Sequence, residues 1–111
     1  MKIVSLNFEI IRATSAVAEF LVRVELDGPA AGCAVTGRVV GPRGEGFSTV
    51  EVAYPVRVLE MSGTAVSLRC VIPEPNLWTP EAPFTYGWSV WVEKDGELTD
   101  TRTGNVVLRA Q

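Results

Sequence analysis

The chain has 111 residues, of which 47% are hydrophobic and 21% charged, and its formal net charge is -3. This length is typical of one domain with one hydrophobic core, so we expect a single domain over residues 1–111. The acidic balance argues against a nucleic-acid partner, because such proteins usually carry a basic stripe. The sequence contains no histidine, which excludes Ser-His-Asp and Cys-His catalytic groups and every zinc site that needs a histidine.

The N-terminal segment "MKIVSLNFEIIRA" lacks the pattern of a secretory signal. Asn7, Glu9 and Arg12 interrupt its apolar residues, whereas a signal peptide needs an uninterrupted apolar stretch. No apolar run in the chain reaches the roughly 20 residues that cross a bilayer as a helix. We therefore expect no membrane partner and, by default, a cytoplasmic location.

Alternation of apolar and polar residues predicts a strand in each of the first two segments. In residues 2–12 it places one apolar set on the inward face: Val4, Leu6, Phe8 and Ile10. In residues 16–26 the inward set is Ala18, Phe20, Val22, Val24 and Leu26. The Asp-Gly-Pro that follows predicts the end of the second strand, since it cannot continue a ladder.

Three more strands are expected in the middle of the chain. In the third, one face carries Cys33, Val35 and Val39. The fourth segment alternates through Val50, Val52 and Tyr54 until Pro55, which cannot donate to a ladder and predicts an edge position or a bend. In the fifth, residues 64–72, the inward set is Val66, Leu68, Cys70 and Ile72.

The last two strands are predicted to form a hairpin. Asp95-Gly96 lies between two alternating runs, which is a strong hairpin signal. The run before it places five residues inward and Trp91 outward; the inward set is Phe84, Tyr86, Trp88, Val90 and Val92. In the run after it, Gly104 predicts a β-bulge.

Together these segments predict an all-β fold, a single immunoglobulin-like antiparallel β-sandwich of about seven strands. No window of useful length has a helical period. The alternative architecture is a small β-barrel with a ligand pocket, which would be lined by Phe20, Tyr54 and Trp88. The proline-rich segment before the sixth strand argues against the barrel.

Cys33 and Cys70 are the two cysteines of the chain. Without an exported context, we expect two buried free thiols, because reduced cysteine behaves as a small hydrophobic residue. A disulfide remains the alternative, and it would require the two Cα atoms to lie within about 7 Å of each other.

Three carboxylates near the last hairpin, Asp95, Glu97 and Asp100, are the remaining candidates for acid–base chemistry or calcium binding. General acid catalysis needs a carboxyl group held in a cleft, and calcium loops carry an ordered run of oxygen ligands. Residues on a tight turn are solvated instead. We interpret these carboxylates as solubilising turn residues and predict no catalytic residue, no cofactor and no metal site.

The connection before the sixth strand, "NLWTPEAPFTY" over residues 76–86, has a structural interpretation of its own. Pro80 and Pro83 hold the backbone extended, so that the connection can cross from one sheet to the other. Trp78 is placed to cap the open end of the sandwich. Tyr86 is placed to direct its hydroxyl back to the backbone of the connection, as in a tyrosine corner.

This connection resembles a segment of the immunoglobulin-like sandwich domain of the family-two glycoside hydrolases, the β-galactosidase, β-glucuronidase and β-mannosidase group. The family pattern Leu-Trp-Ser/Thr-Pro-Glu-x-Pro-x-x-Tyr falls here on Leu77, Trp78, Thr79, Pro80, Glu81, Pro83 and Tyr86. The hairpin is also similar to the family's Gly-x-x-x-Asp turn, on Gly96 and Asp100. Gly104-Asn105-Val106 departs from the family's Gly-aromatic-Arg or Gly-Ile-Arg ending. The chain ends where the family enters its catalytic barrel, so the resemblance implies a non-catalytic sandwich that stands alone.

Two functions are compatible with such a module. The first is a structural or protein-interaction role, with a protein partner or a second copy bound through a sheet face or an edge strand. Its sign would be an apolar patch of Trp91 with Leu21 and Val71, if these lie on neighbouring strands. The second is carbohydrate binding by exposed aromatic rings, for which Trp91 and, less directly, Trp78 are the candidates. The candidate interaction residues are thus Trp91, which both functions use, and Trp78, and neither function makes the chain an enzyme.

Overall fold

The structure is a computed structural model that describes residues 1–44, 46 and 49–110 of the chain. The described residues form seven β-strands and no helix, so the prediction of an all-β fold is confirmed. The strands are β1 (Ile3–Ala13), β2 (Val17–Leu26), β3 (Cys33–Arg43), β4 (Val52–Ser62), β5 (Ala65–Pro73), β6 (Thr85–Lys94) and β7 (Glu97–Val106). In the part of the chain that is described, no helix is long and apolar enough to span a membrane.

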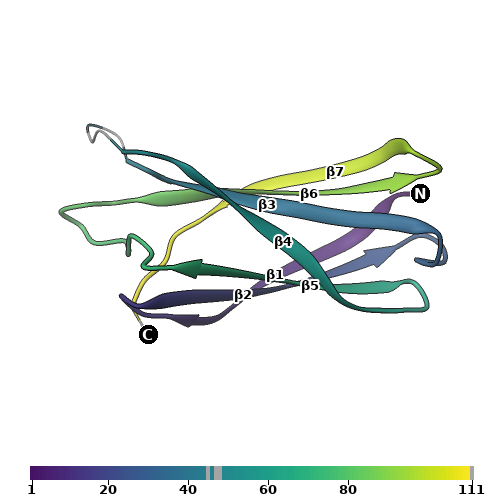
Figure 1. The fold of residues 1–111 in the computed structure, drawn as a ribbon, viewed down its shortest axis with the longest axis horizontal. Helices are drawn as coiled ribbons and strands as arrows, with labels where there is room; N and C mark the ends of the chain where they lie inside the picture. Colours follow the sequence, from purple (N-terminus) through teal and green to yellow (C-terminus); the bar gives the residue numbers. More distant parts are fainter. Residues whose placement is uncertain (45, 47–48, 111) are drawn as a thin grey trace.

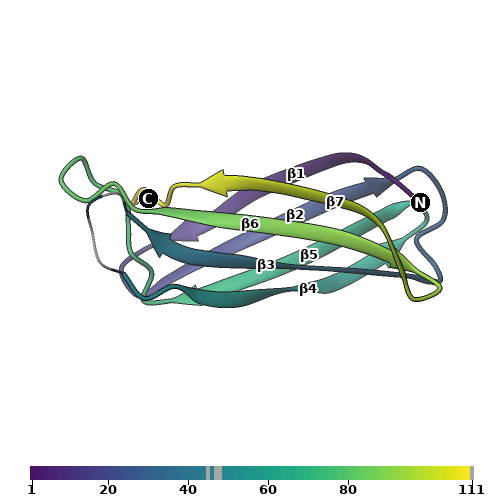
Figure 2. The same cartoon turned by 90° about the horizontal axis from the view of Figure 1, so that it is seen from above.

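The strands are arranged in two facing layers. Their order is β1-β2-β5-β4-β3-β6-β7, and every neighbouring pair is antiparallel. One layer contains β1, β2 and β5, the other contains β3, β6 and β7, and β4 lies between them (Figure 1). Figure 2 shows the second layer crossing over the first. Over the described residues β1 and β7 do not pair, so the sheet curls without closing into the alternative barrel.

Strand β4 belongs to both layers. Residues 52–56 pair with β3, whereas residues 57–62 pair with β5. Figure 1 shows β4 running diagonally from one layer to the other. Pro55 is paired with Arg38 inside the sheet and not at an edge, and the change of partner follows after Val56, one residue beyond the predicted bend. A strand that switches sheets in this way forms a corner between two packed layers.

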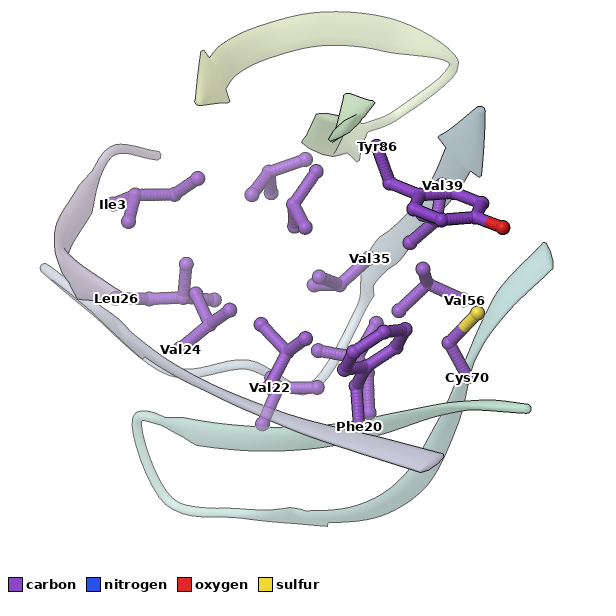
Figure 3. Packing of buried hydrophobic residues seen from close by; sticks show 14 of the residues in the cluster. Ile3, Phe20, Val22, Val24, Leu26, Val35, Val39, Val56, Cys70 and Tyr86 are labelled. Carbon is purple, nitrogen blue, oxygen red and sulfur yellow. The ribbon is translucent and has the colours of Figure 1, made fainter. Parts of the chain in front are cut away.

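The core lies between the layers and consists of the inward faces predicted from alternation. All the predicted inward residues of β2, β3 and β5 are buried. Figure 3 shows side chains of both layers meeting, with Val39 and Tyr86 on one side and Phe20 and Cys70 on the other. Phe20 is fully buried and its ring centroid lies 4.9 Å from that of Phe8. The pocket that a barrel would have lined with Phe20 is therefore occupied by packed side chains.

The prediction that Val4 faces inward is wrong. Ile3 pairs with Leu26 and Ser5 pairs with Glu25, so Val4 is an extra residue in a bulge of β1. The bulge turns Val4 outward, where 61% of its surface is exposed, and places Ile3 in the core instead. A single inserted residue reverses the faces, because the side-chain period of a strand is two.

The bulge predicted at Gly104 is also misplaced. Trp88 is directly opposite Gly104, and the β6–β7 register shifts only between Val92 and Glu93, which leaves Thr99 unpaired. Gly104 has a packing role instead: a Cβ atom there would lie 2.5 Å from Cζ2 of Trp88. The indole occupies the space that a side chain at Gly104 would need.

The β6–β7 hairpin has the predicted turn at Asp95-Gly96. Both residues have positive φ, 54° for Asp95 and 79° for Gly96. Two successive residues with positive φ are the requirement of a type I′ turn, whose twist matches that of the flanking strands. The hairpin prediction is confirmed.

Candidate functional site

Tyr86 forms the predicted hydrogen bond to the β5–β6 connection. Its ring is 1% exposed, and its hydroxyl accepts a 2.9 Å hydrogen bond from the backbone N–H of Asn76. Burial raises the pKa of the Tyr86 hydroxyl, and the Asn76 N–H partly opposes that shift. Gly41 leaves room for the ring, since a Cβ at that position would lie 2.6 Å from Cδ1 of Tyr86. Tyr86 therefore fixes the connection to the core, as a tyrosine corner does.

Trp78 attaches the C-terminal segment to the same connection. Its backbone N–H donates a 2.7 Å hydrogen bond to the carbonyl of Leu108, a residue that is fully buried. The guanidinium carbon of Arg109 lies 4.5 Å from the centroid of the Trp78 ring, which is a cation–π contact. In Figures 1 and 2 this connection and the C-terminus lie at the same end of the molecule. The structural role predicted for Trp78 is supported by these contacts.

A line of three shallow hollows, which we call the β3–β6–β7 groove, runs along the outer face of the second layer. The middle hollow has a volume of about 330 Å³ and shares Arg43 with one neighbouring hollow and Arg38 and Ser89 with the other. Its lining is mainly polar and comprises Arg38, Val40, Arg43, Gly87, Trp88, Ser89, Thr103, Gly104 and Asn105. Neighbouring hollows therefore share lining residues from the β5–β6 connection to the middle of β6.

Gly87 forms the floor of the middle hollow. It is paired with Val40 on one side and Asn105 on the other. A Cβ atom at Gly87 would lie 2.9 Å from Nη1 of Arg43 and 3.7 Å from Oδ1 of Asn105. The missing side chain thus allows a guanidinium group and an amide group to meet over the backbone of β6.

The two predicted interaction residues line the opposite ends of this groove. Trp91 lines a hollow of about 300 Å³ together with Glu93, Leu98 and Thr101. Trp78 lines one of about 600 Å³ with Pro83 and Thr85 at the other end. Trp91 is partly buried and lies between Thr36 of β3 and Thr101 of β7. The structure thus places both tryptophans along one continuous surface.

The groove contains two arginines in a chain whose formal net charge is -3. Arg38 is exposed and forms no ion pair with any described residue, while Arg43 is paired with Glu51. Among the described residues, Glu93 is the one acidic residue that lines the three hollows. Arg38 is therefore the arginine of this surface whose guanidinium is available to an anionic group.

The apolar patch predicted around Trp91 with Leu21 and Val71 does not exist. Trp91 is on β6, whereas Leu21 and Val71 are on β2 and β5 in the other layer. Alternation assigns a face within a strand but does not identify the neighbouring strand.

A different apolar surface lies where β4 changes layers, and we call it the β4–β5 patch. It surrounds a hollow of about 260 Å³ lined by Pro55, Arg57, Val58, Leu59, Arg69 and Val71. The exposed fractions are 41% for Val58, 59% for Leu59 and 38% for Val71. Leu59 occupies a bulge between Val58 and Glu60, which directs its side chain away from the core.

The hairpin carboxylates are not gathered into a site. Asp95 lies in the turn, while Oδ2 of Asp100 accepts a 2.8 Å hydrogen bond from the backbone N–H of Ile3. Within the described ranges, no group of three or more His, Cys, Asp or Glu side chains could hold a metal ion. Asp100 therefore has a structural role that the sequence did not suggest.

The two cysteines are free and buried, as predicted. Cys33 is on β3 and Cys70 is on β5, in different layers. Burial raises the pKa of the Cys70 thiol to about 12. A thiol with such a pKa is protonated at neutral pH and is a poor nucleophile.

Most of the groove could not be predicted from the sequence. Arg38 and Arg43 on β3 and Asn105 on β7 are polar residues on outward faces, where polar residues are expected anyway. Gly87 and Gly104 are the available signals, because an isolated glycine inside a strand often marks a close approach of a neighbouring group.

No protein-family model matches this chain, and no curated protein matches it either. Solved structures do resemble it. A glycosyl hydrolase family 2 member from Bacteroides cellulosilyticus superposes with a TM-score of 0.61 at 16% identity, over 96% of this chain and 15% of that one. A Bacteroides uniformis β-glucuronidase superposes with a TM-score of 0.55 at 17% identity, over 93% of this chain and 13% of that one.

The matched region is thus a domain-sized part of each of these glycosidases, and it makes up 15% and 13% of their lengths. At such low identity the likeness concerns the fold and not the activity. This likeness in fold agrees with the resemblance of residues 77–86 to the family-two glycoside hydrolases. The chain has the all-β fold of a domain-sized part of family 2 glycosyl hydrolase chains.

Proposed function

We propose that this chain is a non-catalytic β-sandwich module that binds a protein partner through a surface of its sheet. The comparisons support this proposal because the matched fold is only 15% and 13% of the glycosidase chains that contain it. A domain-sized part of a longer chain has surfaces that can pack against neighbouring domains. Inter-domain surfaces of this kind resemble transient protein–protein interfaces.

The observation that carries the proposal is the β4–β5 patch. Val58, Leu59 and Val71 are exposed around one hollow and are not part of the buried core. Arg57 lies beside them and has no ion-pair partner among the described residues. An apolar centre with a basic rim is typical of an interaction surface. The first partner to test is a second copy of this chain.

The test is sedimentation velocity of the purified chain over a series of concentrations. We expect reversible self-association, and Leu59→Ser should raise its dissociation constant about tenfold, since a buried leucine side chain contributes about 1.5–3 kcal/mol. Val50→Ser is the matched control, because Val50 is 84% exposed and lies outside the patch. A wild-type chain that stays monomeric at every concentration would contradict self-association through this patch. An equal effect of Val50→Ser would show that the association is unspecific.

Carbohydrate binding is the second candidate, and the β3–β6–β7 groove favours it. Trp91 and Trp78 line its two ends, with hydroxyl and amide side chains between them. Aromatic faces stack on sugar rings, and short polar side chains exchange hydrogen bonds with sugar hydroxyl groups. The test is retention of the chain on immobilised polysaccharides, with Trp91→Ala and Trp78→Ala for comparison. Retention that Trp91→Ala abolishes without unfolding the chain would support a sugar-binding module.

A further inference from the structure

We propose that the β3–β6–β7 groove binds an acidic polysaccharide, with a uronate carboxylate held by Arg38 and Arg43 and a sugar ring stacked on Trp91. This inference rests on the second candidate function and specifies its ligand class. Three properties of the groove lead to it: its length, its neutral polar lining and its two arginines.

The shape of the groove suits an extended ligand. Thr85 lines the hollow at one end and Trp91 the hollow at the other, and both are on β6. They are six positions apart along one strand, which corresponds to about 20 Å at roughly 3.3 Å per residue. The hollows are shallow and open in a row, so a linear chain would contact all three whereas a compact metabolite would contact one.

The lining between the tryptophans suits a ligand with many hydroxyl groups. Ser89, Thr103 and Asn105 line the middle hollow, and each can both donate and accept hydrogen bonds. Ser89 is opposite Thr103 across the β6–β7 pair, and Asn105 is opposite Gly87. Thr103 and Asn105 are thus two residues apart on the outward face of β7, and Ser89 lies beside Thr103 on the same face.

The charges identify an acidic sugar in preference to a neutral one. Arg38 and Arg43 both line the middle hollow, and only Arg43 has a carboxylate partner, Glu51, among the described residues. Planar guanidinium groups match carboxylates in geometry and bind them by charge-assisted hydrogen bonds. A neutral glycan would offer Arg38 no carboxylate to bind.

A nucleic acid is the other extended anion with rings that could stack on a tryptophan. Single strands carry a phosphate at every nucleotide, whereas the groove offers two arginines and includes Glu93. The formal net charge of -3 on the chain also repels a dense polyanion. A uronic-acid polymer carries hydroxyl groups on every ring, and these match the hydrogen-bonding side chains of Ser89, Thr103 and Asn105 better than the bases of a nucleic acid do.

The experiment is affinity electrophoresis and calorimetry of the purified chain with polygalacturonate, an uncharged galactan and a poly(dT) oligonucleotide as probes. We expect binding to polygalacturonate that weakens as salt is added, because the arginine contacts are screened. Arg38→Gln should weaken that binding about tenfold or more, and Trp91→Ala should weaken it by up to about tenfold.

The matched control is Arg23→Gln, which removes an exposed arginine of β2 in the other layer and leaves the groove intact. It should not change binding, and both arginine variants should keep the wild-type unfolding midpoint, while circular dichroism establishes that Trp91→Ala is folded. Equal losses in Arg38→Gln and Arg23→Gln would indicate attraction by overall charge and would overturn the proposed site.

The three probes separate the possible failures. Binding to galactan that Arg38→Gln leaves unchanged would keep the carbohydrate function and overturn the acidic specificity. No binding to either polysaccharide would overturn both. Binding of poly(dT) at least as tight as that of polygalacturonate would make the groove a general polyanion site and overturn the carbohydrate assignment.

Discussion

Tyr86 shows how one side chain holds an irregular segment against the core. Its ring fills the space beside Gly41, and its hydroxyl accepts the backbone N–H of Asn76, ten residues earlier in the chain. The N–H would otherwise lack a partner in a partly buried position, which is unfavourable for a backbone donor. The hydroxyl thus stabilises the connection that carries Trp78.

Removing the Tyr86 hydroxyl should destabilise the chain without emptying the core. Tyr86→Phe keeps the ring and leaves the Asn76 N–H unpaired, so we expect a loss of about 1–2 kcal/mol in the free energy of unfolding, measured by denaturant titration. Tyr54→Phe is the control, because no described residue forms a hydrogen bond with the Tyr54 hydroxyl. Equal losses in the two variants would refute the role given to the Asn76 bond.

At the level of elements, β1 and β7 are the two ends of the strand order and are joined by side chains. The carboxylate of Asp100 accepts the N–H of Ile3, and the guanidinium of Arg102 donates a 2.7 Å hydrogen bond to the carbonyl of Ile3. The backbone N–H and carbonyl of Ile3 are thus both hydrogen-bonded to side chains of β7, although β1 and β7 do not pair as strands. Such contacts protect an edge strand that would otherwise be free to pair with another chain.

The contacts of Asp100 and Arg102 with Ile3, which we call the β1–β7 seam, should be sensitive to acid. The Ile3 N–H, followed by the Thr101 N–H and the positive charges of Arg102 and Lys2, lowers the pKa of Asp100 against the opposing effect of burial. A carboxyl group with a lowered pKa in the folded state adds stability above its unfolded pKa of about 3.9, and this is lost as the pH falls through the folded pKa.

We therefore expect Asp100→Asn to lower the unfolding temperature at pH 7 and to differ less from wild type as the pH falls below about 4. Thermal unfolding followed by circular dichroism over that range measures this. Glu97→Gln is the control, since it removes an exposed carboxylate from the same strand. A difference between Asp100→Asn and wild type that stays constant with pH would argue against an ionised Asp100 at the seam.

At the level of the whole molecule, the core joins two layers through packing and the switched strand β4, with no covalent cross-link. Cys33 and Cys70 face the core from different layers and are free. Cys33 contacts the carbonyl of Pro29 at 3.8 Å, and Cys70 lies beside Val56 in Figure 3. Each thiol acts as a small hydrophobic side chain.

Both thiols should be protected in the folded chain. We expect slow reaction with a thiol reagent at pH 8 under native conditions, and rapid reaction of two thiols per chain in denaturant. Since the pKa of Cys70 is raised to about 12, its contribution to stability is full below the unfolded pKa of about 8.5 and decreases as the pH rises above it. A Cys33→Ala variant assigns the slow phase to Cys70. A native chain that reacts as fast as the unfolded one would contradict this burial.

Four features could be predicted from the sequence: the all-β class, the inward faces of β2, β3 and β5, the Asp95-Gly96 hairpin and the Tyr86 corner. These features follow from short-range properties, namely the period of two in a strand and the φ angles that a turn requires. The predictions failed at Val4 and Gly104, where a bulge or a cross-strand indole depends on the partner strand.

The contacts between β1 and β7, the change of layer in β4 and the groove depend on how distant parts of the chain come together. Ile3 and Asp100 are 97 residues apart in the chain, and no local pattern indicates that they meet. Arg38, Gly87 and Asn105 come from three different strands, and no local sequence pattern indicates that they line one hollow. Which strands become neighbours is a collective outcome of packing two layers around one core, so the surfaces that could bind a partner are defined only once the chain is folded.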